Sequence, residues 1–221
     1  MILNIIDEGM CSYSAMLSRQ RQLFHHMVAR KKEGLPIEEE FIFMVEHPAV
    51  ITLGRHAKEA NVLHNQEELA ARGVELFHIE RGGDVTYHGP GQLVAYPLVD
   101  LEYHHLGVKD YVTLLEEAVI RTIADFGIIG ERVPGASGVW IDSGTSHERK
   151  ICALGVKCSR FITMHGLALN VNTDLGGFDL INPCGFIGKG VTSMAAELNH
   201  CLLLDNVKSS LSNHLRTLLN F

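Results

Sequence analysis

The sequence has little basic charge, few cysteines and no long apolar run. Its 221 residues carry 19 Lys and Arg against 26 Asp and Glu, a formal net charge of −7. A nucleic-acid-binding chain needs clustered basic side chains for its phosphate contacts, so this balance argues against a nucleic-acid partner. No apolar stretch approaches the length of a membrane span, and no basic segment precedes an apolar one at the N-terminus. We therefore expect a cytoplasmic protein that does not enter a membrane.

Cysteine and histidine patterns also exclude common site types. The five cysteines show neither C-x-x-C spacing nor a disulfide-dense pattern, which fits a reducing compartment: Cys11, Cys152, Cys158, Cys184 and Cys201. Thirteen histidines are present, but H-E-x-x-H and Cys/His pairs at zinc spacing are absent. We expect no metal site.

The remaining composition, 46% hydrophobic, fits a single domain over residues 1–221. Apolar spacing and stop residues predict helices near 12–33, 66–72, 108–126, 193–200 and 206–219. Apolar and β-branched runs predict strands, in order, within "FIFMVEHPAVITLG" (two strands around His47-Pro48), "VELFHIE", "LVAYPLVDL", "GVWID", "KICALGVKCS" and "FITMHGLALNVN". The last three indicate an antiparallel meander. The expected fold class is α/β (α+β), a mixed sheet with flanking helices.

A glycine-rich run, "RGGDVTYHGPGQ" (81–92), separates two of these strands and is expected to be largely loop. It lacks the phosphate-loop pattern and does not match G-x-G-x-x-G. Glycines permit close backbone approach to a ligand, and Arg81, Tyr87 and His88 among them could supply polar contacts. The run is either a ligand-binding loop or an ordinary connection.

One cysteine lies in an unusual context. Cys152 and Cys158 are an even number of residues apart in one predicted strand, so they share a face and are expected to pack. Cys184 instead lies between Pro183 and Gly185, in a predicted tight turn. It is either a packing residue or an exposed nucleophile. A nucleophilic thiolate needs a cation or base nearby, and Lys150, His88 and His165 are candidates that sequence alone does not rank.

These segments, taken in order, resemble the lipoyl(octanoyl) transferase family. The matching motifs are "EHPAVITLGR" (46–55), "RGGDVTYHGPGQLVAYPL" (81–98), "RKICALGVK" (149–157), "HGLALNVN" (165–172) and "INPCG" (181–185). The resemblance covers nearly the whole chain. One departure is the polar insertion "DSGTSHE" (142–148), which indicates an extended hairpin turn.

The resemblance implies a fold shared with lipoate and biotin protein ligases and a reaction by acyl transfer. An octanoyl group would move from acyl carrier protein to a lysine ε-amine of a lipoyl domain. The family's catalytic cysteine falls on Cys184 and its catalytic lysine on Lys150. A thioester is already activated, so a thiolate can accept the acyl group without ATP. As a hypothesis, Lys150 lowers the pKa of Cys184 and later accepts the proton of the attacking amine.

The family's substrate-binding segments fall on three stretches of this chain. They comprise Arg81, Gly82, Gly83, Asp84, Val85, Thr86, Tyr87 and His88, then Ala153, Leu154 and Gly155, and finally Gly166, Leu167 and Ala168. His165 is a further possible site residue. The implied partners are acyl carrier protein, the lipoyl domains of 2-oxoacid dehydrogenase complexes and the glycine cleavage H protein. We expect a monomer. We also expect no cofactor, because the acyl group arrives on the carrier's phosphopantetheine.

Three alternatives stay open at this point. A lipoate or biotin ligase would need ATP and no nucleophilic cysteine. A Cys-His thioester hydrolase would use Cys184 with His88 or His165, and a carrier-binding module would need no catalysis. Because acyl carrier protein is acidic, the octanoyltransferase also needs a local basic surface, for which the basic residues within 149–160 are the candidates.

Overall fold

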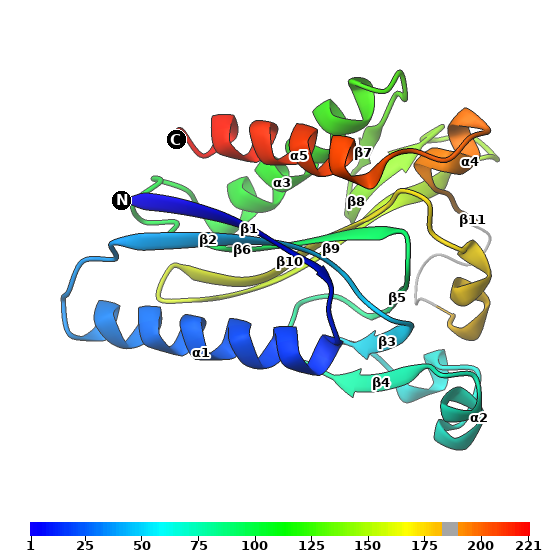
Figure 1. Cartoon of the computed structure of the whole chain (residues 1–221), viewed down its shortest axis with the longest axis horizontal. Coiled ribbons are helices and arrows are strands. Elements are labelled where there is room, and N and C mark those ends of the chain that lie inside the picture. The colour runs from blue at the N-terminus through cyan, green and yellow to red at the C-terminus, as the bar shows by residue number, and fades with distance from the viewer. Residues whose placement is uncertain (183–189) are drawn as a thin grey trace.

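The computed structural model describes residues 1–182 and 190–221, and a mixed eight-stranded sheet runs through their centre (Figure 1). The strand order is β1-β2-β6-β10-β9-β8-β7, and β11 pairs with β9. The strands are β1 (Ile2–Met10), β2 (Glu39–Glu46), β6 (Gln92–Leu98), β7 (Glu131–Val133), β8 (Ala136–Ile141), β9 (Arg149–Ser159), β10 (Ile162–Asn170) and β11 (Gly190–Val191). The predicted α/β class is confirmed.

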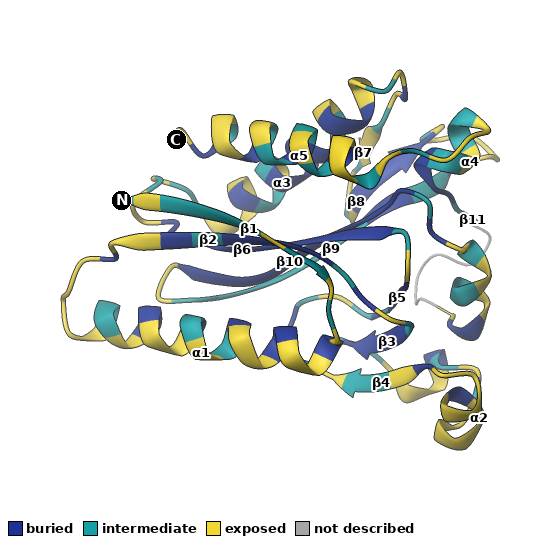
Figure 2. Cartoon of the chain, in the orientation of Figure 1, coloured by how far each residue is buried: buried dark blue, intermediate teal, exposed yellow. Residues whose placement is uncertain are grey.

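Helices cover both faces of this sheet (Figure 1). Helix α1 (Tyr13–Lys32) packs on one face, and α3 (Val108–Ala124) and α5 (Leu204–Leu218) pack on the other. Their buried sides face the strands and their exposed sides face solvent (Figure 2). Because β6 is covered on both faces, all seven of its residues are buried. Such a strand is apolar along its whole length instead of alternating.

The helices form where the apolar spacing predicts them. Ser12 caps α1 by accepting a hydrogen bond from Ala15 N, and three basic residues fill its last turn. In α3 the buried stripe includes Tyr111, Leu115, Val119 and Ile123. The shorter α2 (Gln66–Ala71) and α4 (Met194–Leu198) also lie within the expected ranges. Local periodicity is thus sufficient to locate these helices.

A second, three-stranded sheet has the order β4-β3-β5, with β3 (Val50–Leu53) between β4 (Glu75–His78) and β5 (Val85–His88). The glycine-rich run 81–92 is largely loop, as expected, but residues 85–88 form a strand because they pair antiparallel with β3. The two predicted strands around His47-Pro48 are present as β2 and β3, and they belong to different sheets, so that turn carries the chain from one sheet to the other.

The predicted meander is confirmed, because β8, β9 and β10 pair antiparallel in succession. Residues 142–148 connect β8 to β9 as the extended turn that the polar insertion indicates. Cys152 is fully buried and Cys158 partly buried in the core beside α3, as their common face predicts. Strands β1, β7 and β11 were not predicted. Among the described residues, no helix combines the length and apolar character needed to span a bilayer.

Candidate active site

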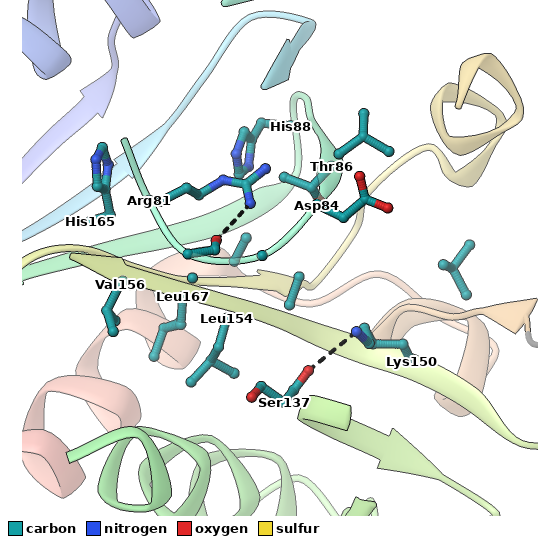
Figure 3. Close-up of a pocket in the computed structure, with 18 of the residues that line it drawn as sticks. Arg81, Asp84, Thr86, His88, Ser137, Lys150, Leu154, Val156, His165 and Leu167 are labelled. Atoms are coloured by element: carbon teal, nitrogen blue, oxygen red, sulfur yellow. Dashed lines mark hydrogen bonds between the residues drawn. The ribbon is translucent and has the colours of Figure 1, made fainter. Parts of the chain in front are cut away.

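A cavity of about 920 Å³ lies where the two sheets meet. Its walls come from the loop before β5, from the adjoining parts of β9 and β10, and from the start of β8. Apolar side chains also line it, among them Val94, Leu154, Leu167 and Ala168. Polar groups lie at two separate ends, one around Lys150 and the other around Arg81, His88 and His165 (Figure 3).

Close backbone contacts hold the Arg81–Asp84 loop over β9. Gly82 N donates a hydrogen bond to Val156 O at 2.9 Å, and a Cβ atom at Gly155 would lie 2.8 Å from Gly82 O. On the opposite side a Cβ atom at Gly54 would lie 2.5 Å from Gly83 O. Real Cβ atoms do not approach backbone atoms this closely, so glycines permit the loop to lie between β3 and β9.

Arg81 is a buried cation within this loop. Its Nη2 donates hydrogen bonds to Thr52 O at 2.8 Å and Thr52 Oγ1 at 3.0 Å. Its Nη1 donates to Gly82 O at 3.1 Å (Figure 3). Burial lowers the pKa of the guanidinium, but its ordinary value is so high that it stays charged. The cation therefore fixes the loop through neutral oxygen acceptors.

Two neutral imidazoles lie near Arg81. Burial, together with nearby His47, lowers the pKa of His88 to about 3, and His88 Nδ1 is hydrogen-bonded to Gln92 Oε1 at 2.8 Å. Burial also lowers the pKa of His165 to about 3. His165 is 2% exposed and adopts φ 63°, a left-handed conformation that costs a residue other than glycine about 1–3 kcal/mol. Neither of its ring nitrogens has a hydrogen-bond partner in the described part of the chain.

At the other end of the cavity, Lys150 extends from β9 beside β8. Its Nζ donates a hydrogen bond to Ser137 O at 3.2 Å and lies 4.5 Å from the ring centroid of Trp140 (Figure 3). Both an acceptor oxygen and an aromatic face interact favourably with an ammonium group. The backbone of Lys150 is held on its other edge by Thr192 N, which donates to Lys150 O at 2.9 Å. The amine is therefore positioned by β8 and β11 together.

Cys184, the predicted nucleophile, lies outside the described residues. Asn182 and Gly190, the nearest described residues on either side of it, both line the cavity. Gly190 and Val191 pair with Arg149 and Lys150. His165 instead pairs with Val156, six residues along β9, which corresponds to about 20 Å of strand. The structure thus brings Gly190 and Val191 beside Lys150 and keeps His165 about 20 Å away along the strand.

Most residues of the three predicted binding segments line the cavity. Those that do are Arg81, Gly82, Gly83, Asp84, Val85, Thr86, His88, Ala153, Leu154, Gly155, Gly166, Leu167 and Ala168, together with His165. Tyr87 does not. Its ring packs against Phe178 with centroids 5.5 Å apart, in the core of the smaller sheet.

The sequence did not indicate several residues that organise the cavity. Asn61 Nδ2 donates hydrogen bonds to both Asp84 carboxylate oxygens at 3.0 and 3.1 Å, and Asn61 O accepts one from Asn182 N at 2.7 Å. Asn61 thereby connects the glycine-rich loop to Asn182. Ser137 and Trp140 provide the environment of Lys150. No spacing in a single sequence relates these positions to one another.

The basic residues within 149–160 are the candidates for a local basic surface. Arg149 forms ion pairs with Asp142 and Glu197, and Lys157 forms one with Glu80. Arg149 and Arg160 lie at opposite ends of an 11-residue strand and its turn, so these side chains are spread along the strand. Their role in docking an acidic carrier protein stays a prediction.

Comparison with known proteins gives one consistent set of relatives. The family described as "Lipoyl protein ligase A/B catalytic domain" matches residues 12–216. An octanoyltransferase from Bacteroides thetaiotaomicron is 53% identical over 98% of this chain and 95% of its own. The fold is similar to a bi-partite lipoate protein ligase from Thermoplasma acidophilum (TM-score 0.69, 15% identity, 99% and 83% coverage). It is also similar to a biotin protein ligase from Aquifex aeolicus (TM-score 0.51, 10% identity, 100% and 69% coverage).

Proposed function

The chain belongs to the lipoyl protein ligase A/B catalytic-domain family, and we propose how its cavity carries out the reaction of the octanoyltransferases in it. It is an octanoyltransferase of protein lipoylation, as its relatives at 46–54% identity over most of the chain indicate. Its acceptors are lipoyl-domain proteins. The resemblance to the family supports the finer steps described below. The main structural observation in their favour is that Lys150 lines the cavity.

In the first step, the Cys184 thiolate attacks the thioester carbonyl of octanoyl-acyl carrier protein. The carbon–sulfur bond to phosphopantetheine breaks, the pantetheine sulfur leaves as a thiolate that takes up a proton, and an octanoyl-cysteine thioester forms. In the second step, the ε-amine of the acceptor lysine attacks this thioester. An amide forms, the amine loses a proton, and the Cys184 sulfur is released. Splitting the transfer lets two protein substrates bind in turn.

Lys150 has two functions in this scheme. Its ammonium group stabilises the Cys184 thiolate before acylation and gives a proton to the departing pantetheine thiolate. The neutral amine that results then receives the proton of the attacking lysine. Two observations support this assignment: Lys150 lines the cavity, and β11, which follows the cysteine-bearing segment directly, pairs with Lys150. His165 lies about 20 Å along the strand from Lys150, which disfavours a Cys-His hydrolase built on that histidine.

The octanoyl chain binds among the apolar side chains that line the cavity. Leu154 and Leu167 are two of these, and their side chains lie on the side of β9 and β10 away from Arg81 (Figure 3). The distance of about 20 Å along β9 exceeds the length of an extended eight-carbon chain. Burying each methylene group contributes about 0.8 kcal/mol, so the chain supplies most of the binding energy of this part of the substrate.

The remaining partners are proposed on the same basis. The donor is acyl carrier protein, and the acceptors are the lipoyl domains of 2-oxoacid dehydrogenase complexes and the glycine cleavage H protein. The enzyme acts as a monomer in the cytoplasm, as one domain over residues 1–221 and without a cofactor. Among the described residues, three or more His, Cys, Asp and Glu side chains do not gather as a metal site would require.

Intact-protein mass spectrometry after incubation with octanoyl-acyl carrier protein tests the nucleophile. The wild-type chain and a Cys201→Ala control, which removes an exposed cysteine, should gain one octanoyl group. Cys184→Ala should gain none. An octanoyl adduct that still forms on Cys184→Ala would contradict the assignment.

The lysine is tested by separating the two steps. Lys150→Ala should slow both acyl-enzyme formation and transfer, whereas Lys150→Arg should retain a cation and slow mainly the transfer, because arginine does not accept a proton at neutral pH. Lys109→Ala, at an exposed position in α3, is the control. A normal transfer rate with Lys150→Arg would refute the proton-accepting role.

The alternative reactions give different products. A ligase would convert ATP and free octanoate to octanoyl-AMP and pyrophosphate, and a hydrolase would release octanoate from octanoyl-acyl carrier protein when no acceptor protein is present. We expect neither reaction in the absence of a lipoyl-domain acceptor. Release of pyrophosphate would identify a ligase, and steady release of octanoate would identify a hydrolase.

A further inference from the structure

A buried carboxylate contacts the peptide group that holds Lys150. Glu116 on α3 is 7% exposed, and its Oε1 accepts a hydrogen bond from Gly138 N at 2.9 Å. Gly138 follows Ser137, whose carbonyl oxygen accepts the hydrogen bond from Lys150 Nζ. The N–H of Gly138 and the C=O of Ser137 belong to one peptide group.

This arrangement places a negative and a positive group on opposite sides of one peptide. In a trans peptide the N–H and C=O bonds point in opposite directions. The Glu116 carboxylate therefore accepts a hydrogen bond from the N–H, while the Lys150 ammonium donates one to the carbonyl oxygen on the other side. Hydrogen bonds in such a chain polarise one another, and both are strengthened by an ionised partner.

The geometry around this peptide leaves it little freedom. Gly138 has φ 130°, and a Cβ atom there would lie 2.6 Å from Cys152 O and 3.3 Å from Lys150 Cε.

The other Glu116 oxygen, Oε2, lies 3.3 Å from Arg132 Nε. Trp140 Nε1 donates a hydrogen bond to Ala136 O at 3.0 Å, which holds the preceding part of β8. Glycine is required where β8 passes this close to the stem of Lys150.

We propose that Glu116 is a positioning residue for the transfer reaction and acts on Lys150 through the Ser137–Gly138 peptide. It orients the Ser137 carbonyl and strengthens it as an acceptor, so that the amine is held at one place in the cavity. This inference rests on the proposed role of Lys150 in the reaction. Glu116 itself does not line the cavity.

Two substitutions at Glu116 separate its effects. Glu116→Gln retains an oxygen acceptor for Gly138 N but removes the charge, and Glu116→Leu removes both. We expect Glu116→Leu to lower the first-order rate of octanoyl-enzyme formation about ten- to a hundredfold, the effect of losing a hydrogen bond to a charged group. The KM for octanoyl-acyl carrier protein should stay unchanged, and Glu116→Gln should recover most of the rate.

Glu117→Gln is the matched control. Glu117 is the neighbouring residue on α3 and also binds Arg132, at 2.6 Å, but has no contact with the Ser137–Gly138 peptide. We expect a wild-type rate for this variant. An equal loss for Glu117→Gln would assign the effect to Arg132 and overturn the proposal.

A double-mutant cycle separates positioning from general destabilisation. If Glu116 acts through Lys150, then Glu116→Leu should cause no further loss of rate in a Lys150→Ala background. Independent, multiplicative losses would overturn the proposal. If Glu116→Leu does not fold, the same cycle with Glu116→Gln decides, because that substitution keeps the volume of the side chain; its smaller loss should likewise vanish with Lys150→Ala.

The proposed function can fail separately. A wild-type rate for Lys150→Ala would remove Lys150 from the mechanism, and the positioning role with it. A strong loss for Lys150→Ala together with a wild-type rate for folded Glu116→Leu would overturn only the role of Glu116.

Discussion

Replacing Gly166 by alanine should destabilise the protein strongly, although Gly166 lines the cavity. In β10, Gly166 pairs with Gly155 of β9. It directly precedes Leu167, the residue at which the pairing of β10 with β6 ends. A Cβ atom at Gly166 would lie 2.1 Å from Ala95 O and 2.8 Å from Pro97 Cδ. Both neighbours belong to β6, which is buried on both faces and pairs with β2 on its other side. The neighbouring strand therefore cannot move away without disturbing the sheet.

The magnitude follows from this contact. A distance of 2.1 Å is well below the 3.0 Å that real Cβ atoms keep from other heavy atoms, so the two backbones must separate by about 1 Å. Overpacking in a tight core costs about 1–3 kcal/mol. Weakening two backbone hydrogen bonds between β10 and its neighbours adds about 1 kcal/mol each. We expect a loss of about 3–5 kcal/mol in the free energy of unfolding, a large part of the stability of a typical domain.

Urea denaturation of the wild type, Gly166→Ala and Gly82→Ala measures this effect. Gly82 also lines the cavity, but a Cβ atom there would lie 3.3 Å from Val156 O, which a small shift can relieve. Gly82→Ala should cost no more than about 1 kcal/mol. A free energy of unfolding for Gly166→Ala within about 1 kcal/mol of the wild type would refute the reasoning. If that variant instead raised the KM for octanoyl-acyl carrier protein, Gly166 would act in substrate binding alone.

Two further predictions concern buried charges. Burial lowers the pKa of three imidazoles from an ordinary value of 6.5 to about 4, 3 and 3, in His47, His88 and His165. A lowered pKa means that the unfolded chain takes up protons first, so stability is full above pH 6.5 and falls as the pH drops toward 3. Urea denaturation should show a loss of up to about 2 kcal/mol per histidine between pH 7 and pH 5, and a pH-independent midpoint would contradict this. Separately, Lys31→Met should cost about 3 kcal/mol, because it leaves the nearly buried Asp100 carboxylate without the cation at 2.8 Å. Lys208→Met, which removes the partner of a half-exposed carboxylate, should cost less than about 1 kcal/mol, and equal losses for the two variants would be inconsistent with this difference.

Local pattern was sufficient for much of the fold. The spacing of apolar residues predicts α1 and α3 close to their observed ends, because a helix has a fixed period and recognisable caps. The meander of β8, β9 and β10 follows from short strands separated by turns. The strand within the glycine-rich run was not predicted, because Val85–His88 becomes a strand only through pairing with β3. Its glycines indicate loop when read without that partner.

By itself, the sequence determined the fold class, most helices, the family resemblance and the identity of Lys150 and Cys184 as candidates. These properties depend on short-range periodicity or on motifs a few residues long. Only the tertiary structure decided that Lys150 and Arg81 lie at different ends of one cavity and that the Tyr87 ring packs outside it. It also decided that Glu116 is hydrogen-bonded to the same Ser137–Gly138 peptide group that accepts the hydrogen bond of Lys150. Glu116 and Lys150 are 34 residues apart in the chain and lie on different elements. Their relation exists only once α3 packs against β8, and no local pattern records that contact.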